Sequence, residues 1–116
     1  MSVEVTTDLS VILKRVKKGE QMLKEQVTEA VIVYGNVYCP EDTGDLQRSA
    51  TSASRPKEGE AIWDKEYAAE NYYGVNRKFS KDRNPNAQAM WAEAGVANHK
   101  EDIDATAQKA FERGMG

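Results

Sequence analysis

The segment CPEDTGDL, residues 39–46, contains an Asp-Thr-Gly run, which is the catalytic signature of aspartic proteases. In that chemistry two aspartates share a proton at the floor of a dry cleft, and small viral enzymes assemble the pair from two subunits. Asp42 would be the catalytic carboxylate. Its surroundings argue against this function, because Glu41 and Asp45 crowd the same turn and no glycine-rich flap follows. A protease is therefore the weakest alternative, and no catalytic residue is predicted.

The same segment is explained better as a turn that reverses the chain. Pro40 ends the preceding helix, because the residue before a proline disfavours the helical conformation. The Asp42 side chain is expected to cap the next backbone amides, Gly44 to supply backbone freedom, and Leu46 to return to the core. The predicted fold-defining turn consists of Pro40, Asp42, Thr43, Gly44 and Leu46.

No other group of side chains predicts a metal or cofactor. His99, the single histidine, lies on an apolar stripe with Val96 and Ile103 and is expected to pack there. The carboxylates at positions 101, 102 and 104 lack the glycine-bearing loop of calcium sites. A single cysteine excludes an internal disulfide and a cysteine-cluster zinc site. The sequence therefore predicts no cofactor and no metal.

Aromatic side chains and a basic loop follow one another between residues 63 and 83. Aromatics beside a basic loop can stack single-stranded bases, so a small DNA-binding module using loop 77–83 stays open as an alternative. Glu66 and Glu70 in the same stretch repel phosphate, however, and tyrosine is enriched at protein interfaces. The favoured interpretation is a subunit interface made of Tyr67, Tyr72, Tyr73, Arg77, Lys78, Lys81 and Arg83.

The elements that position these residues can be read from apolar spacing. Apolar residues recur every three, four or seven positions from Leu9 to Val37, which predicts a long helix ending before Pro40. The segments 47–55 and 60–64 flank Pro-Lys-Glu-Gly and predict a β-hairpin. Asn84-Pro85 resembles a helix start, and apolar spacing continues that last helix toward Arg113.

At 116 residues the chain is expected to form one α+β domain, a long N-terminal helix packed on a small antiparallel sheet with a C-terminal helix. The predicted parts are an N-terminal extension or strand (1–7), the long helix (8–38), a turn and β-hairpin (39–65), a short helix and exposed basic loop (66–83), and the C-terminal helix (84–116).

Charge and hydropathy narrow the class of partner. The net charge is −3 and the isoelectric point is about 5.2, whereas general affinity for nucleic acid needs a basic excess. The N-terminal residues show no secretion signal, and no apolar run is long enough for a bilayer. The sequence therefore predicts no membrane association and synthesis in a reducing cytoplasm.

The order of these motifs resembles one protein family. The long helix leads into Tyr-Cys-Pro-Glu-Asp-Thr-Gly-Asp-Leu at 38–46, with Ser49 beyond it. Then follow Glu-Ala-Ile-Trp at 60–63, Tyr67-Ala68, Tyr-Tyr-Gly at 72–74, Asn-Pro-Asn-Ala at 84–87 and Trp91. From Val31 to His99, this pattern resembles the minor capsid and head–tail connector proteins of long-tailed bacteriophages, particularly those of Gram-positive hosts, which belong to the wider tail-completion group.

The resemblance implies a structural virion protein without catalytic residues. Such proteins are α+β, with a small sheet on the long helix, and form rings, often of six subunits, at the head–tail joint. The implied partners are further copies of the chain, other connector proteins, the portal side and the tail tube, with DNA only as cargo in the lumen. The implied location is the virion, after assembly in the host cytoplasm. In isolation the chain is expected to be a monomer or a weak oligomer, because connector subunits must stay apart until assembly.

Overall fold

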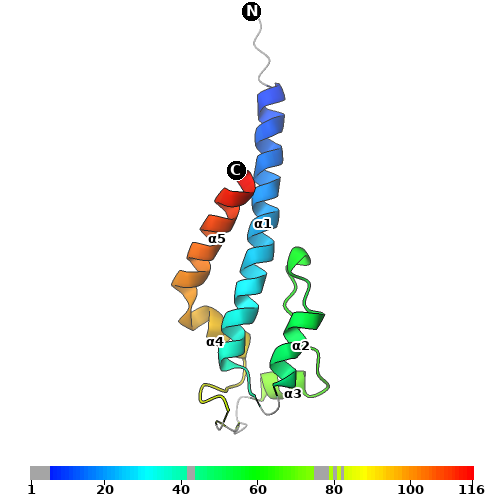
Figure 1. Cartoon of the computed structure of the whole chain (residues 1–116), viewed down its shortest axis with the longest axis vertical. Helices are drawn as coiled ribbons and strands as arrows, with labels where there is room; N and C mark the ends of the chain where they lie inside the picture. Colours follow the sequence, from blue (N-terminus) through cyan, green and yellow to red (C-terminus); the bar gives the residue numbers. More distant parts are fainter. Residues whose placement is uncertain (1–5, 42–43, 75–78, 80, 82) are drawn as a thin grey trace, which may run out of the picture.

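The chain folds into helices only, within the residues that its computed structural model describes: 6–41, 44–74, 79, 81 and 83–116, with side chains from residue 14 onward. The elements are α1 (Thr6–Tyr38), α2 (Asp45–Ala53), the 3-10 turn η1 (Pro56–Glu58), α3 (Ala68–Tyr73), α4 (Trp91–Asn98) and α5 (Lys100–Met115) (Figure 1). No strand occurs in these ranges. The expected α+β fold with an antiparallel sheet is therefore wrong, and the protein is all-α.

Helix α1 is the long axis of the molecule. It spans 33 residues and ends at Tyr38, two residues before Pro40, where the sequence placed the end of a helix over 8–38. The radius of gyration is 18.7 Å, whereas a compact domain of this length has about 13 Å. The molecule is therefore a rod rather than a globule.

Helices α4 and α5 return antiparallel along α1 and approach it closely at two pairs of glycines (Figure 1). A Cβ atom on Gly95 would lie 2.7 Å from the backbone nitrogen of Gly35. At the other end, a Cβ atom on Gly114 would lie 2.7 Å from the Cα atom of Gly19 and 2.6 Å from the Lys18 carbonyl oxygen. These separations leave no room for a side chain, so the helices touch backbone to backbone at both ends of the pair.

The segment expected to form the β-hairpin, within 39–65, instead forms helix α2 and a strand-like segment that is hydrogen-bonded to the α2 region. Among the described residues of this segment, only Arg55 and Glu60 form a β-bridge, around the Pro56–Gly59 turn. Beyond this bridge, the amides of the segment bond to serine side chains of the α2 region instead of to the backbone of a second strand. The amide of Ile62 donates to Ser54 Oγ at 2.8 Å, and the amide of Asp64 donates to Ser49 Oγ at 3.0 Å. The turn was placed correctly, but the strands were not.

The C-terminal helix expected over 84–116 begins later and is broken. It starts at Trp91, after Met90 in the left-handed region with a φ of 50°, and changes direction at His99 between α4 and α5. The amides before Trp91 bond to other elements instead of starting a helix, since Gln88 donates to the Tyr38 carbonyl at 3.0 Å and Met90 to that of Tyr72 at 2.9 Å. The segment 84–90 thus crosses over the end of α1.

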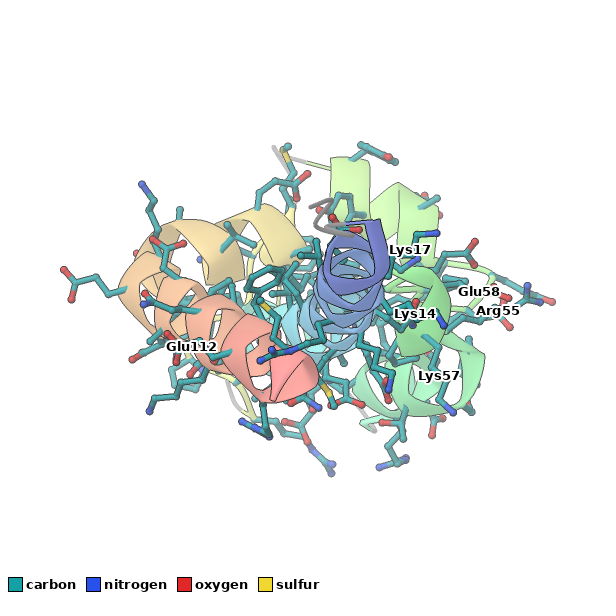
Figure 2. The ribbon with its side chains drawn as sticks, turned by 90° about the horizontal axis from the view of Figure 1, so that it is seen from above. Lys14, Lys17, Arg55, Lys57, Glu58 and Glu112 are labelled. Carbon is teal, nitrogen blue, oxygen red and sulfur yellow. The ribbon has the colours of Figure 1, made fainter. Side chains whose placement is uncertain are left out.

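Turn η1 lies against α1 on the side away from α5 (Figure 2). Gln21 Nε2 donates to the Lys57 carbonyl at 2.8 Å, and a Cβ atom on Gly59 would lie 3.0 Å from the side chain of Lys24. Helix α1 therefore separates two flanks, one formed by α5 and the other by η1.

The glycine contact between α1 and α4 predicts in which direction a substitution changes the free energy of unfolding. In an exposed helix, alanine is more stable than glycine by about 1 kcal/mol. We expect Gly95→Ala to destabilise instead, by roughly 1–3 kcal/mol, because its Cβ atom would overlap backbone atoms of α1. Urea unfolding measures the difference, with Ala97→Gly at an exposed position of the same helix as the propensity control. A stabilised Gly95→Ala variant would contradict the close contact.

Candidate functional site at the C-terminal end of the first helix

The carbonyl groups at the end of α1 are bonded by three residues from two separate parts of the chain, helix α2 and segment 84–90. The last carbonyls of a helix have no partner within it. Gln47 Nε2 donates to the carbonyls of residues 36 and 39 at 3.1 and 3.3 Å. Asn84 Nδ2 donates to those of residues 37 and 39 at 2.9 and 2.7 Å, and the Gln88 amide donates to that of Tyr38. The end of α1 is therefore the point where α2 and the crossing segment 84–90 are joined.

Asn84 has a role that its local sequence concealed. The Asn-Pro pair predicted a cap for the following helix, but the buried Asn84 side chain serves the preceding long helix. Its Oδ1 atom also accepts the Asn86 amide at 3.0 Å, which shapes the turn itself. Gln47 was not predicted as a site residue at all, because a single glutamine in a polar stretch carries no sequence signal for a contact eight residues back.

The turn after α1 has the backbone conformation expected of its glycine. Gly44 has a φ of 84°, which L side chains adopt only with strain, and it precedes α2 directly. Leu46 is buried, and Asp45 forms an ion pair with Arg48 at 2.6 Å on the surface. The predicted roles of Asp42 and Thr43 lie outside the described residues.

An aromatic core lies next to this turn. Trp91, Cys39, Leu46 and Ala68 are buried together, and Tyr38, Trp63 and Tyr72 pack against them. The Trp91 ring meets Tyr72 at 4.7 Å and Trp63 at 6.0 Å between centroids, both edge to face. Trp63 Nε1 donates to Asn36 Oδ1 of α1 at 2.8 Å. The core thus ties α3, α4 and the segment after η1 to the end of α1.

Cys39 lies inside this core, and its thiol is unreactive in the folded protein. Burial, together with the negative charge of Glu41, raises the pKa of the Cys39 thiol from 9.0 to about 12. The reactive form of cysteine is the thiolate, so the folded protein holds this side chain in its unreactive form at neutral pH.

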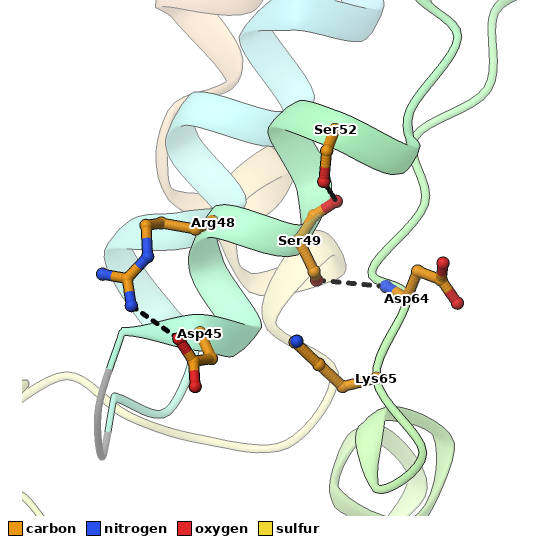
Figure 3. Close-up of a pocket in the computed structure, with 6 residues that line it drawn as sticks. All are labelled: Asp45, Arg48, Ser49, Ser52, Asp64 and Lys65. Carbon is orange, nitrogen blue, oxygen red and sulfur yellow. Dashed lines mark hydrogen bonds and ion pairs between the residues drawn. The ribbon is translucent and has the colours of Figure 1, made fainter.

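A surface hollow lies beside α2 and contains a serine hydroxyl, Ser49 Oγ (Figure 3). Its Ser49 hydroxyl donates to the Leu46 carbonyl at 2.6 Å and accepts the Asp64 amide. The hydroxyl therefore belongs to the fold rather than to a reaction. The residues around the hollow are Asp45, Arg48, Ser49, Ser52, Asp64 and Lys65, which include no general base of the histidine type.

His99 lies at the bend between α4 and α5 and packs on α1. Its ring stacks on Tyr34 with centroids 4.4 Å apart, and its Nε2 atom is 3.3 Å from the Tyr38 hydroxyl. Asp102 Oδ2 is 3.8 Å from Nδ1. These contacts agree with the packed histidine that the apolar stripe predicted.

The residues of the predicted interface occupy different environments. Tyr72 packs on Trp91, whereas Tyr73 is 73% exposed and Tyr67 43% exposed. Lys81 and Arg83 are exposed as well. Arg77 and Lys78 lie outside the described residues. A hollow between Tyr73 and the core is lined by Trp63, Ala68, Ala69, Tyr72, Tyr73 and Trp91.

Two further features of the described residues bear on the class of protein. No group of three or more histidine, cysteine, aspartate or glutamate side chains among them is placed to hold a metal ion. None of the described helices is both long and apolar enough to cross a membrane.

The sequence matches the family described as minor capsid protein over residues 3–115. The match covers nearly the whole chain, so this protein belongs to the minor capsid protein family, which are structural proteins of bacteriophage particles. The comparison with curated proteins found no match, and neither did the comparison with solved structures.

The left-handed conformation of Gly44 predicts the cost of replacing it. We expect Gly44→Val to destabilise the protein by more than about 1 kcal/mol, because a β-branched residue is strained at positive φ. The melting temperature should fall by about 4 °C or more. Gly74→Val is the matched control, since Gly74 has a φ of −83°. Equal melting temperatures for the two variants would contradict the strain.

The buried thiol predicts both slow labelling and a loss of stability at high pH. Cys39 should react with a thiol reagent only as fast as the protein unfolds. Its pKa is higher in the folded than in the unfolded chain, so its contribution to stability is present below pH 9 and declines as the pH rises from about 9 to about 12. Urea unfolding across this range, compared with Cys39→Ala, isolates the contribution. Fast labelling of the native protein would show that the thiol is accessible.

Proposed function

We propose that this minor capsid protein acts at the joint between capsid and tail, as a head–tail connector or tail-completion component. In this proposal several copies form a ring that joins the portal side to the tail tube and leaves a lumen for DNA. The family membership supports a virion component. The motifs between Val31 and His99 support the connector position, because they resemble those of connector proteins in the same order.

The exposed aromatic surface beside the core is the observation that carries the proposal. Tyr73, Tyr67 and Met90 are 73%, 43% and 39% exposed, and Tyr73 borders a hollow that reaches Trp91. A tyrosine exposed beside an apolar hollow is suited to contact with another protein, since aromatic residues and methionine are enriched at interfaces. This surface therefore fits a neighbouring subunit or connector protein.

Two further observations agree with a protein that lets DNA pass through a lumen rather than one that binds DNA. The net charge is negative, so the chain as a whole repels phosphate. The stretch of sequence that leads to Lys81 and Arg83 also carries Glu66 and Glu70, whose carboxylates repel phosphate. We therefore keep loop 77–83 as part of the contact surface and not as a DNA-binding site.

The proposal is tested in a phage whose copy of this gene is deleted. We expect full heads and complete tails to accumulate separately, and the purified protein to restore infectious particles when added to a mixture of the two. Electron microscopy and plaque counts measure both effects. Joined particles in the absence of the protein would place it elsewhere in the capsid. Tight, salt-dependent binding of the protein to a short DNA duplex would instead support the DNA-binding alternative.

Adjacent tyrosines provide a matched pair of variants. We expect Tyr73→Ser to leave the melting temperature unchanged and to block joining of heads and tails, because its ring is exposed. Tyr72→Ser should destabilise the protein by roughly 3 kcal/mol, because it removes an aromatic ring packed on Trp91. Circular dichroism separates the two effects. A folded Tyr73→Ser variant that still joins heads to tails would remove Tyr73 from the interface.

A further inference from the structure

The flank of α1 that carries η1 is cationic. Lys14, Lys17 and Lys24 are exposed and spaced by three and seven residues, so they lie on one stripe of α1. Gln21 on the same stripe binds the Lys57 carbonyl and thereby adds Lys57 and Arg55 of the turn to it. Within the described residues, Lys14, Lys17 and Lys57 form no ion pair, and Arg55 pairs with Glu58 at 3.5 Å. We call this surface the cationic flank: Lys14, Lys17, Lys24, Arg55 and Lys57. Figure 2 labels all of these except Lys24.

The outer face of α5 is acidic. Glu101, Asp104, Gln108 and Glu112 are exposed and spaced by three and four residues, which places them on one face opposite the buried Ile103 and Ala110. Gln108 Nε2 donates to Glu112 Oε1 at 3.3 Å. The exposed cations of α5 other than Lys100, which begins the helix, are Lys109 and Arg113, which follow on the next stripe. We call the face made of Glu101, Asp104, Gln108 and Glu112 the acidic flank.

The two flanks lie on opposite sides of α1 and match in length. Figure 2 shows Glu112 on one side of the rod and Lys14, Lys17 and Lys57 on the other. At 1.5 Å per residue, the stripe from Lys14 to Lys24 is about 15 Å long and that from Glu101 to Glu112 about 16 Å long. Because the flanks face away from each other, they cannot neutralise one another within one chain.

Contacts with α1 also place part of both flanks at the same height along the rod. On one side, Lys57 is bonded to Gln21. On the other, Gly114 lies against Gly19 and Arg15 Nε donates to the Met115 carbonyl at 2.8 Å. Glu112 and Lys57 are therefore level. Subunits of a closed ring are related by rotation alone, so in a ring whose axis follows α1 only residues at one height meet.

We propose that the cationic flank of one copy binds the acidic flank of the next, with Glu112 facing Lys17 and Lys57 of its neighbour. This proposal rests on the ring of the proposed function and names the surfaces that form it. A contact between two different faces of identical subunits is heterologous and closes into a ring when the rotation permits. Complementary charge sets the register of such contacts.

A second copy fits the cationic flank better than DNA does. The turn that supplies Arg55 and Lys57 also carries Glu58 and Glu60, both exposed. These carboxylates would face a phosphate backbone, which offers only negative groups. The face of α5 offers carboxylates together with Lys109 and Arg113 on the next stripe, and can therefore accommodate Glu58 and Glu60 beside the cationic flank.

Zero-length crosslinking tests the contact directly. A carbodiimide activates a carboxylate, and attack by a lysine amine forms an amide while the reagent takes up the elements of water. The chain is treated at high concentration and low salt as an equal mixture of ¹⁴N- and ¹⁵N-labelled copies. We expect mixed-isotope peptides that join Glu112 to Lys17 or Lys57. Crosslinks between copies that avoid both flanks, or none at all, would overturn the proposal.

Charge reversal supplies the independent measurement. We expect Lys17→Glu with Lys57→Glu to lower the self-association constant in sedimentation experiments about tenfold, and added Glu112→Lys to restore part of it. Arg48→Glu with Lys65→Glu, two exposed positions beside α2 and outside both flanks, changes the net charge equally and should have no such effect. Association that is equally weakened in the control, or is insensitive to salt, would contradict the contact. A chain that stays monomeric throughout would also contradict the contact. The same holds if the lysines of the cationic flank are needed only for binding a short DNA duplex.

The outcomes also separate this contact from the proposed function. A phage that joins heads to tails without the protein would refute the connector position while leaving the crosslinks and the charge rescue intact. Conversely, loss of joining in the deleted phage together with flank-independent crosslinks would keep the connector position and refute this interface.

Discussion

The hydrogen bonds to the last carbonyl groups of α1 are the constraint on which the rest of the structure depends. A helix ends with carbonyls that lack internal partners, and those of α1 are enclosed by other elements. The donors come from Gln47, from Asn84 and from the Gln88 amide, which are separated by up to about forty residues. Leaving a buried acceptor unpaired costs roughly 1–3 kcal/mol. The chain satisfies these groups only when α2 and segment 84–90 meet at one point.

This meeting point determines where the remaining elements lie. Asn36 in the last turn of α1 binds Trp63, and Trp63 packs on Trp91 at the start of α4. From there α4 can only return along α1, and Gly95 on Gly35 and Gly114 on Gly19 allow the return helices to lie in backbone contact with it. The result is a rod with a broad aromatic end and two flanks whose separation is fixed by α1.

How much of this could be predicted from the sequence follows from the range of each interaction. The long helix depends on local apolar spacing and on Pro40, and both are visible in the sequence. The left-handed Gly44 is also local, since a turn chemistry of aspartate and glycine indicates it. The segment QRSATSASR was interpreted as a strand because it is small and polar, but Leu46 just before it, with Ser49 and Ala50, forms the buried face of helix α2. Gln47, Arg48, Ala50 and Ala53 favour a helix, so local propensity agreed with the structure and the strand prediction overlooked it.

The candidate site was harder to predict, because its donors act at a distance. Asn84 next to Pro85 looks like a helix cap, and nothing nearby in the sequence shows that its amide belongs to α1. The glycine pairs are likewise invisible, since a glycine in a helix usually marks only a weak position. The aromatic stretch was predicted as an interface from its composition, but sequence could not separate the packed Tyr72 from the exposed Tyr73 next to it.

The distribution of charge bears on how such a protein avoids assembling too early. An exposed ion pair contributes about 0–1 kcal/mol, so the proposed contact between flanks would hold two isolated copies together only weakly, at high protein concentration and low salt. If the proposed ring forms, binding of each copy at its aromatic end to a neighbouring protein would make the flank contacts of adjacent copies intramolecular in effect, so that their weak affinities would multiply. A net charge of −3 does not reveal this arrangement, because it sums the basic and acidic groups of the whole chain. Under the proposed function, weak binding between flanks and stronger binding at the aromatic end would make the ring close only where the neighbouring protein is already in place.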